Sequence, residues 1–145
     1  MKRITVLLAD DNRVVRKEFR KILELEDDLE VVGEAKDGRQ AVAMVKRLRP
    51  EVVLMDIAMP RLNGFEATRE ILQGAPATRV VMLSAHSEDV YVKEATKSGA
   101  IGYLIKQACV DDVCGAIREV QKGHTCYSPS IPGRLHKRNG KKQMD

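Results

Sequence analysis

What is scarce in this sequence of 145 residues excludes several classes of protein. Its three cysteines, Cys109, Cys114 and Cys126, are an odd number without a CxxC pair, which argues against a disulfide scaffold and against structural zinc. We therefore expect reduced thiols and a cytoplasmic location. No apolar run reaches membrane-spanning length, and Asp10 and Asp11 end the first run before it is long enough for a secretion signal.

Aromatic residues are also few. The chain has no tryptophan, three tyrosines and two phenylalanines, so little is available to stack on nucleic acid bases. The formal net charge of +4 suggests nucleic-acid binding at first sight, but residues 129–145 hold five of the 25 basic residues and only one of the 21 acidic residues. We predict a neutral folded domain over residues 1–128 and a basic flexible tail or truncated linker over 129–145.

Short apolar runs alternate with helical patterns along the body of the chain. Four continuous runs predict buried parallel strands, and a weaker run containing Glu30 and Glu34 is typical of a strand at a sheet edge. Between the runs, small or apolar residues recur at spacings of three and four, which favours amphipathic helices. We predict an α/β fold with one doubly wound, five-stranded parallel sheet, and we take its order to be 2-1-3-4-5, the known flavodoxin-like arrangement of such sheets. The predicted strands are residues 4–9, 29–35, 52–55, 80–83 and 101–105.

Polar residues stand where the predicted strands end, which is where ligands of doubly wound sheets bind. Asp10 and Asp11 follow the first strand, Asp56 the third, and Ser84 and Lys106 the fourth and fifth. In the predicted order the first and third strands are neighbours, so three carboxylates meet in one crevice. Two unit charges about 4 Å apart repel by about 4 kcal/mol at an effective dielectric constant of about 20, so these acids must take up protons or bind a cation.

The donor types in this crevice favour Mg²⁺ and a phosphoryl group. A set of carboxylates without histidine or cysteine suits Mg²⁺, which prefers oxygen ligands. Lys106 and the hydroxyl of Ser84 then provide a cation and a donor for an anion held beside the metal. We expect that anion to be a phosphoryl group.

Five features of the sequence occur in one order and spacing: Asp10-Asp11, DIAMPRLNG at 56–64, Ser84-Ala85, Tyr103 and Lys106. Together they resemble the receiver domains of two-component response regulators, and the resemblance runs from residue 4 to about residue 130. Segments 83–106 and 123–131 look most like receivers that precede a helix-turn-helix DNA-binding domain.

The resemblance implies roles for the residues of the crevice. Asp56 is the expected phosphoacceptor, supplied by a sensor histidine kinase or a phosphotransfer protein. Asp11, Asp56 and the backbone carbonyl of Ala58 are the expected direct ligands of Mg²⁺, with Asp10 acting mainly through water. Lys106 is expected to bridge to the phosphoryl oxygens. The chain is then no conventional enzyme, but one that catalyses its own Mg²⁺-dependent phosphorylation and dephosphorylation weakly.

The resemblance also implies a switch. Ser84 is expected to move and bond the phosphoryl group while Tyr103 swings inward, which remodels the face built from residues 87–122. An output domain or a protein partner is expected at that face, and a homodimer is possible. The residues expected to flank the phosphoryl group are Ala58, Ala85 and His86.

Some of these residues also have simpler interpretations, which the sequence leaves open. Asp11 and Asn12 could cap the first helix. Tyr103 could be a packing residue of its strand, and His86 could be a solvated loop residue.

Other phosphate chemistries fit the sequence less well. A haloacid-dehalogenase-like phosphatase needs a second aspartate two positions after its nucleophile, where this chain has Ala58. A flavin module needs a hydroxyl-rich or glycine-rich loop after the first strand, and a nucleotide triphosphatase needs a GxxxxGK[ST] loop; neither is present.

The alternative that stays open lies within signalling. The chain is either a natural single-domain regulator or a receiver fragment of a DNA-binding transcriptional regulator whose output domain is missing. The residues after Ser128 have no helical period, so we expect no sequence-specific DNA binding by this chain. Because no apolar run reaches membrane-spanning length, we also expect no membrane association.

Overall fold

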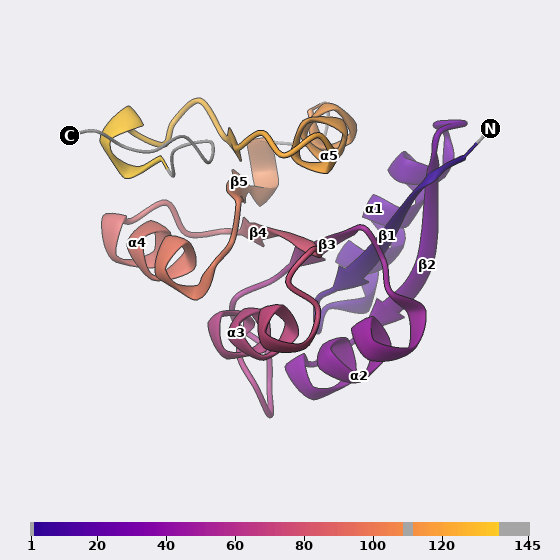
Figure 1. Ribbon diagram of the computed structural model, residues 1–145. Coiled ribbons are helices and arrows are strands. Elements are labelled where there is room, and N and C mark those ends of the chain that lie inside the picture. Colours follow the sequence, from indigo (N-terminus) through magenta and orange to yellow (C-terminus); the bar gives the residue numbers. More distant parts are fainter. Residues whose placement is uncertain (1, 109–111, 137–145) are drawn as a thin grey trace.

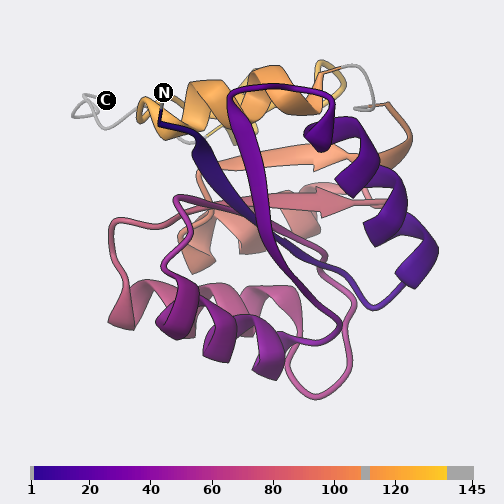
Figure 2. The same ribbon diagram turned by 90° about the vertical axis from the view of Figure 1, so that its right-hand side faces the viewer.

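A parallel sheet covered by helices on both faces forms the body of the protein (Figures 1 and 2). The computed structural model describes residues 2–108 and 112–136. No helix in these two ranges is both long and apolar enough to cross a membrane. The strands are β1 (Ile4–Ala9), β2 (Leu29–Ala35), β3 (Val52–Met55), β4 (Arg79–Ser84), β5 (Gly102–Ile105) and β6 (Cys126–Tyr127). The helices are α1 (Arg13–Glu24), α2 (Gly38–Leu48), α3 (Gly64–Gly74), α4 (Asp89–Ser98) and α5 (Val113–Gln121), with 3₁₀ turns η1 (Lys106–Ala108) and η2 (Gly133–Leu135).

The strands lie in the order β2-β1-β3-β4-β5-β6, and all neighbours are parallel. The predicted order 2-1-3-4-5 is confirmed, with β2 at one edge. The predicted count of five is one short, because β6 pairs with β5 at the other edge. Strand β6 has two residues, so it contains no apolar run from which it could be predicted. Its pairing with β5 depends on Gly102, where a Cβ would lie 2.3 Å from the carbonyl oxygen of Cys126.

Alternate strand residues pack on opposite faces of the sheet, as expected for a pleated strand covered on both sides. Leu7 of β1 belongs to a core with α2, α3 and α4, whereas its neighbour Leu8 belongs to a core with α1 and α5. Figure 2 shows the two helical layers above and below the sheet. This packing leaves the carboxyl ends of β1, β3, β4 and β5 together at one edge of the molecule.

The chain after β6 packs against α4 and the end of β5. The hydroxyl of Ser128 accepts a hydrogen bond from the backbone N–H of Ile105 (2.8 Å), Ile131 and Leu135 are buried, and η2 contacts α4. Arg134 forms an ion pair with Asp89 at the start of α4 (2.8 Å). The predicted domain boundary at residue 128 therefore lies within a packed segment. Residues 137–145 of the predicted tail lie outside the described residues.

The packing of this segment predicts a loss of stability when its apolar contacts are removed. Ile131 is 3% exposed, so Ile131→Ala should lower the free energy of unfolding by about 2 kcal/mol or more, because a cavity replaces buried methyl groups. Val90→Ala is the control, since Val90 lies 68% exposed on α4 and should change stability by no more than about 0.5 kcal/mol. Urea unfolding measures both. An Ile131→Ala variant as stable as the control would contradict the packing.

Candidate functional site

Three carboxylates meet at the carboxyl ends of β1 and β3. Asp10 and Asp11 follow β1, and Asp56 follows β3. The backbone N–H of Asp56 donates to the carbonyl of Ala9 (2.8 Å), which ties the two strand ends together. One carboxylate oxygen from each of the three aspartates lies within 4.8 Å of the other two. Asp10 and Asp56 are buried, whereas Asp11 is exposed.

The turn after β1 is held by Asn12. Its side chain caps α1 by accepting hydrogen bonds from the backbone N–H groups of Val14 (2.9 Å) and Val15 (3.2 Å). Its own N–H donates to Oδ1 of Asp10 (2.8 Å). Of the two capping residues considered from the sequence, Asn12 is the cap and Asp11 is not. The carboxylate of Asp11 does not cap the helix and instead belongs to the acidic cluster.

The loop after β3 folds tightly around Asp56. Gly64 donates its N–H to the carbonyl of Ile57 (2.8 Å), and a Cβ at Gly64 would lie 2.2 Å from the carbonyl oxygen of Asp56. Only glycine leaves room for this approach. Ala58 is exposed in the same loop, two residues beyond Asp56.

Lys106 reaches the cluster from the end of β5. Its Nζ lies 2.8 Å from Oδ2 of Asp10 and 3.3 Å from Oδ1 of Asp56. The side chain of Lys106 is mostly buried. One positive charge therefore faces two buried carboxylates and the nearby carboxylate of Asp11.

This imbalance changes how the groups ionise. Burial and the charge of Asp10 raise the pKa of Asp56 to about 6, and Lys106 offsets this only in part. Burial alone would lower the pKa of Lys106, but its contacts with Asp10 and Asp56 outweigh burial and raise it. Near neutral pH, Lys106 is charged and Asp56 gives up its proton less readily than an exposed aspartate.

The donor set fits a hard divalent cation. Oδ2 of Asp10 is buried and, apart from the ion pair with Lys106, has no hydrogen-bond partner among the described residues. The nearby donors are carboxylate oxygens, which Mg²⁺ prefers and zinc sites seldom use alone. Three acids and one lysine leave excess negative charge that a divalent cation would neutralise.

Ser84 and Tyr103 meet at the loop between β4 and α4. The buried Oγ of Ser84 accepts the backbone N–H of His86 (3.0 Å), and the hydroxyl of Tyr103 donates to the carbonyl of His86 (2.7 Å). The ring of Tyr103 is fully buried, and burial raises the pKa of its hydroxyl. The Tyr103 ring thus lies inward in this structure, and His86 joins both residues through its backbone.

The side chain of His86 is directed toward α4. Its ring stacks on Tyr91 with 4.4 Å between centroids, and its Nδ1 lies 3.5 Å from Oε1 of Glu88. Ala85 is exposed beside it. Tyr91 could not be identified from the sequence, because a ring stack between a loop and the helix after it leaves no periodic signal.

A second group missed from the sequence is the network around Glu34. This residue was interpreted only as a polar position on an edge strand, but basic side chains of α1 cover it. An acid within an apolar strand, together with basic residues at Arg16, Lys17 and Arg20, was the available signal.

The raised pKa of Asp56 predicts that its charge destabilises the metal-free fold. Because the folded pKa of about 6 exceeds the value of about 4 in an unfolded chain, the free energy of unfolding falls as pH rises between these values. Asp56→Asn should therefore be more stable than wild type at pH 7 by on the order of 2 kcal/mol. The difference should narrow as pH is lowered toward about 4.

Urea unfolding in a chelating buffer measures this difference. Asp27→Asn is the matched control, since Asp27 is exposed and outside the cluster, and it should change stability by no more than about 0.5 kcal/mol. A metal-free Asp56→Asn variant that is less stable than wild type at pH 7 would contradict this prediction. It would show that nearby positive charge already compensates the carboxylate of Asp56.

Comparison with protein families matches residues 6–118 to the response regulator receiver domain. The chain is 38% identical over 135 residues to the transcriptional regulatory protein DegU of Brevibacillus brevis, covering 93% of this chain and 57% of that protein. It is 34% identical over 132 residues to the transcriptional regulatory protein LiaR of Bacillus subtilis (strain 168), covering 91% of this chain and 63% of LiaR. The chain thus spans less than two thirds of the length of either relative.

Solved structures give the same result. A two-component response regulator of the LuxR family from Aurantimonas sp. SI85-9A1 matches with a TM-score of 0.86 and 31% identity, covering 90% of this chain and 93% of that one. The response regulator domain of Thermotoga maritima CheB matches with a TM-score of 0.78 and 32% identity, covering 83% and 98%. With its parallel sheet and its polar strand ends, this chain belongs to the response regulator receiver domain family of two-component signalling.

Proposed function

We propose that this receiver domain accepts a phosphoryl group on Asp56 from a sensor histidine kinase or a phosphotransfer protein. One observation carries the proposal: the buried carboxylate of Asp56 lies within 4.8 Å of those of Asp10 and Asp11, with Nζ of Lys106 at 3.3 Å. A carboxylate that lies beside a lysine and two further acids able to bind a cation is suited to phosphoryl transfer. That reaction depends mainly on neutralising the negative charge of the transferring oxygens.

In the proposed reaction, a carboxylate oxygen of Asp56 attacks phosphorus. The bond from phosphorus to the donor breaks, and its electron pair leaves on the imidazole nitrogen of phosphohistidine or on the oxygen of a small acyl phosphate. The product is an acyl phosphate on Asp56, which water later hydrolyses to free phosphate. Lys106 is close enough to donate to the phosphoryl oxygens, because its Nζ already contacts Asp56.

The residues proposed to hold Mg²⁺ are Asp11, Asp56 and the carbonyl of Ala58, with Asp10 acting mainly through water. When bound, the ion supplies further neutralisation of charge on the transferring oxygens. Asp10 and Lys106 keep each other oriented through their 2.8 Å ion pair.

The switch is proposed to begin at Ser84. A phosphoryl group on Asp56 offers acceptor oxygens to the Ser84 hydroxyl, and the backbone of His86 links Ser84 to Tyr103. Movement of Ser84 then alters the contacts of Tyr103 and, through the His86 stack on Tyr91, those of α4. The responding face is residues 87–122, of which 109–111 lie outside the described residues.

Access of water to the phosphoryl group is proposed to depend on Ala58, Ala85 and His86. The two alanines are exposed and small, so neither side chain would exclude water from a phosphoryl group on Asp56. The ring of His86 stacks on Tyr91 of α4, and its proposed role is to control how water enters from the loop that carries Ala85.

The proposed setting is the cytoplasm, with residues 1–128 as the receiver and 129–145 as a linker or tail whose first part, through Ile131 and Leu135, packs on the receiver. The alternative function, a receiver portion of a DNA-binding regulator, is supported by the coverage of 57% and 63% of relatives named transcriptional regulatory proteins. The face at 87–122 would then contact an output domain, a protein partner or a second copy. We propose no sequence-specific DNA binding by the present chain.

Labelling with a small acyl phosphate tests the phosphoacceptor. The wild-type chain with Mg²⁺ should gain one phosphoryl group by mass spectrometry, and Asp56→Asn should gain none, because an amide cannot form the acyl phosphate. The control Asp27→Asn should be labelled like wild type. Labelling of Asp56→Asn at the wild-type rate, or unchanged labelling after chelation of the metal, would refute the assignment.

Tyr103→Phe tests the switch, because it keeps the buried ring and removes the hydroxyl that donates to the His86 carbonyl and lies in hydrogen-bond contact with Ser84. Amide NMR spectra with a phosphoryl mimic such as beryllofluoride should show shifts across residues 87–122 in wild type. In Tyr103→Phe, mimic binding should persist while the shifts in α4 shrink. If the α4 shifts in the variant equal those of wild type, Tyr103 does not transmit the change from Ser84 to α4.

A further inference from the structure

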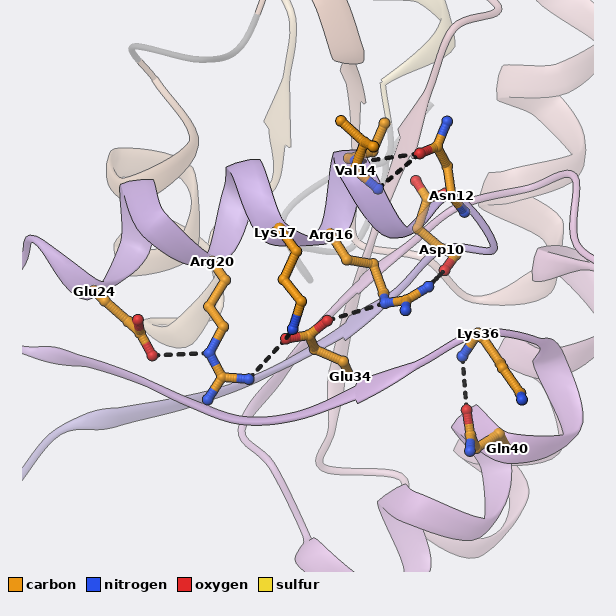
Figure 3. A network of polar contacts seen from close by, with 11 residues as sticks. Asp10, Asn12, Val14, Arg16, Lys17, Arg20, Glu24, Glu34, Lys36 and Gln40 are labelled. Atoms are coloured by element: carbon orange, nitrogen blue, oxygen red, sulfur yellow. Dashed lines mark hydrogen bonds and ion pairs between the residues drawn. The ribbon is translucent and has the colours of Figure 1, made fainter.

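An ion-pair network joins α1 to β2 and reaches Asp10 of the acidic cluster (Figure 3). Its centre is Glu34 of β2, whose side chain is 11% exposed. Oε1 of Glu34 accepts a hydrogen bond from Nε of Arg16 (3.0 Å). Oε2 of Glu34 accepts from Nζ of Lys17 (3.1 Å) and from Nη1 of Arg20 (2.8 Å). One carboxylate on the sheet thus holds three cations of α1.

The side chains of Arg16 and Glu34 are both mostly withdrawn from solvent. The side chain of Arg16 is 13% exposed. Burial would raise the pKa of Glu34, but hydrogen bonds from Arg20, Arg16 and Lys17 lower it to about 2. Because both partners are withdrawn from solvent, their geometry is far more restricted than that of an exposed pair.

Arg16 has a second contact that its neighbours lack. Its Nη1 donates to the backbone carbonyl of Asp10 (2.7 Å). Lys17 and Arg20 make no hydrogen bond or ion pair with Asp10 in the described part of the chain. The guanidinium of Arg16 therefore joins Glu34 of β2 to the peptide that follows β1.

That peptide links the two aspartates of the cluster. The Asp10 carbonyl and the Asp11 N–H belong to one planar unit, so the direction of the carbonyl fixes the direction of the Cα of Asp11. The N–H of Asp10 is already held by the carbonyl of Ala35 in β2 (3.0 Å). The Asp11 side chain makes no hydrogen bond or ion pair with any residue that the structure describes. Its placement therefore depends on its backbone.

We propose that Arg16, anchored by Glu34, is a positioning residue that holds the Asp10–Asp11 peptide in the orientation needed to bind Mg²⁺. The inference rests on the proposed function, in which this cluster takes the metal. Arg16 does not touch the metal or the phosphoryl group in this role. It acts on Asp11 through the Asp10 carbonyl, and Glu34 fixes the guanidinium from the other side.

Mg²⁺ alone is the probe, followed by calorimetry and amide NMR on the full chain. Arg16→Met should weaken Mg²⁺ binding about tenfold, the lower end of the range for partners that orient metal ligands. Arg20→Met is the matched control, since it removes ion pairs to both Glu34 and Glu24 but leaves the Asp10 carbonyl bonded. Its Mg²⁺ affinity should stay within about twofold of wild type.

Two further readouts separate positioning from general stability. In metal-free protein, the amide resonances of Asp11 and Asn12 should shift in Arg16→Met and stay in place in Arg20→Met. In labelling with a small acyl phosphate, the Mg²⁺ concentration for half-maximal rate should rise in Arg16→Met, while the rate at saturating Mg²⁺ stays close to wild type. Arg16→Lys keeps the charge but offers one nitrogen where Arg16 uses two, so its affinity should be intermediate.

The outcomes distinguish this inference from the function on which it rests. If wild type binds no Mg²⁺ and is not labelled, the proposed function fails and the positioning role fails with it. If wild type binds Mg²⁺ and a folded Arg16→Met or Arg16→Lys binds it equally well, only the positioning role is overturned. Equal weakening in Arg16→Met and Arg20→Met would also overturn it, because the effect would then come from the ion pairs and not from the Asp10 carbonyl.

Discussion

Excess negative charge at the carboxyl edge of the sheet is the constraint on which the rest of this structure depends. Asp10, Asp11 and Asp56 lie within 4.8 Å of one another, and Lys106 supplies one positive charge against them. Burial, together with repulsion from Asp10, raises the pKa of Asp56 to about 6. Binding of a cation would relieve the repulsion among these carboxylates and lower the pKa of Asp56. The proposed nucleophile, Asp56, would then be fully ionised near neutral pH.

The fold holds these groups together from several directions. Strand pairing joins the ends of β1 and β3, Gly64 lets the next loop close over Asp56, and β5 brings Lys106 from the far side. The same strand carries Tyr103, whose hydroxyl is bonded to the loop before α4. The segment after β6 bonds to the backbone of β5 through Ser128 and to α4 through Arg134. Strand β5 therefore connects three parts of the molecule: Lys106 of the charged site, the buried Tyr103, and the segment after β6.

The parallel sheet and the polar strand ends could be predicted from the sequence, because buried parallel strands appear as continuous apolar runs and their carboxyl ends share one edge. The strand order followed from the known flavodoxin-like arrangement and not from any run in the sequence. The short strand β6 could not, since it depends on a close approach of backbone at Gly102. The charges of Glu34 and of the basic residues of α1 hint at a contact, but that Arg16 is the residue that also reaches Asp10 depends on how α1 lies over β2. The packing of Ile131 was missed because neighbouring prolines, glycine and basic residues resemble a tail.

The central claim is that the strand-end carboxylates are short of positive charge and that a divalent cation corrects this. Titration of the Asp56 carboxyl carbon by NMR, with and without Mg²⁺, tests it most directly. The account predicts a pKa near 6 in metal-free protein and a clear fall when Mg²⁺ is added. An Asp56 carboxyl that titrates near its ordinary value of about 4, unchanged by Mg²⁺, would contradict it.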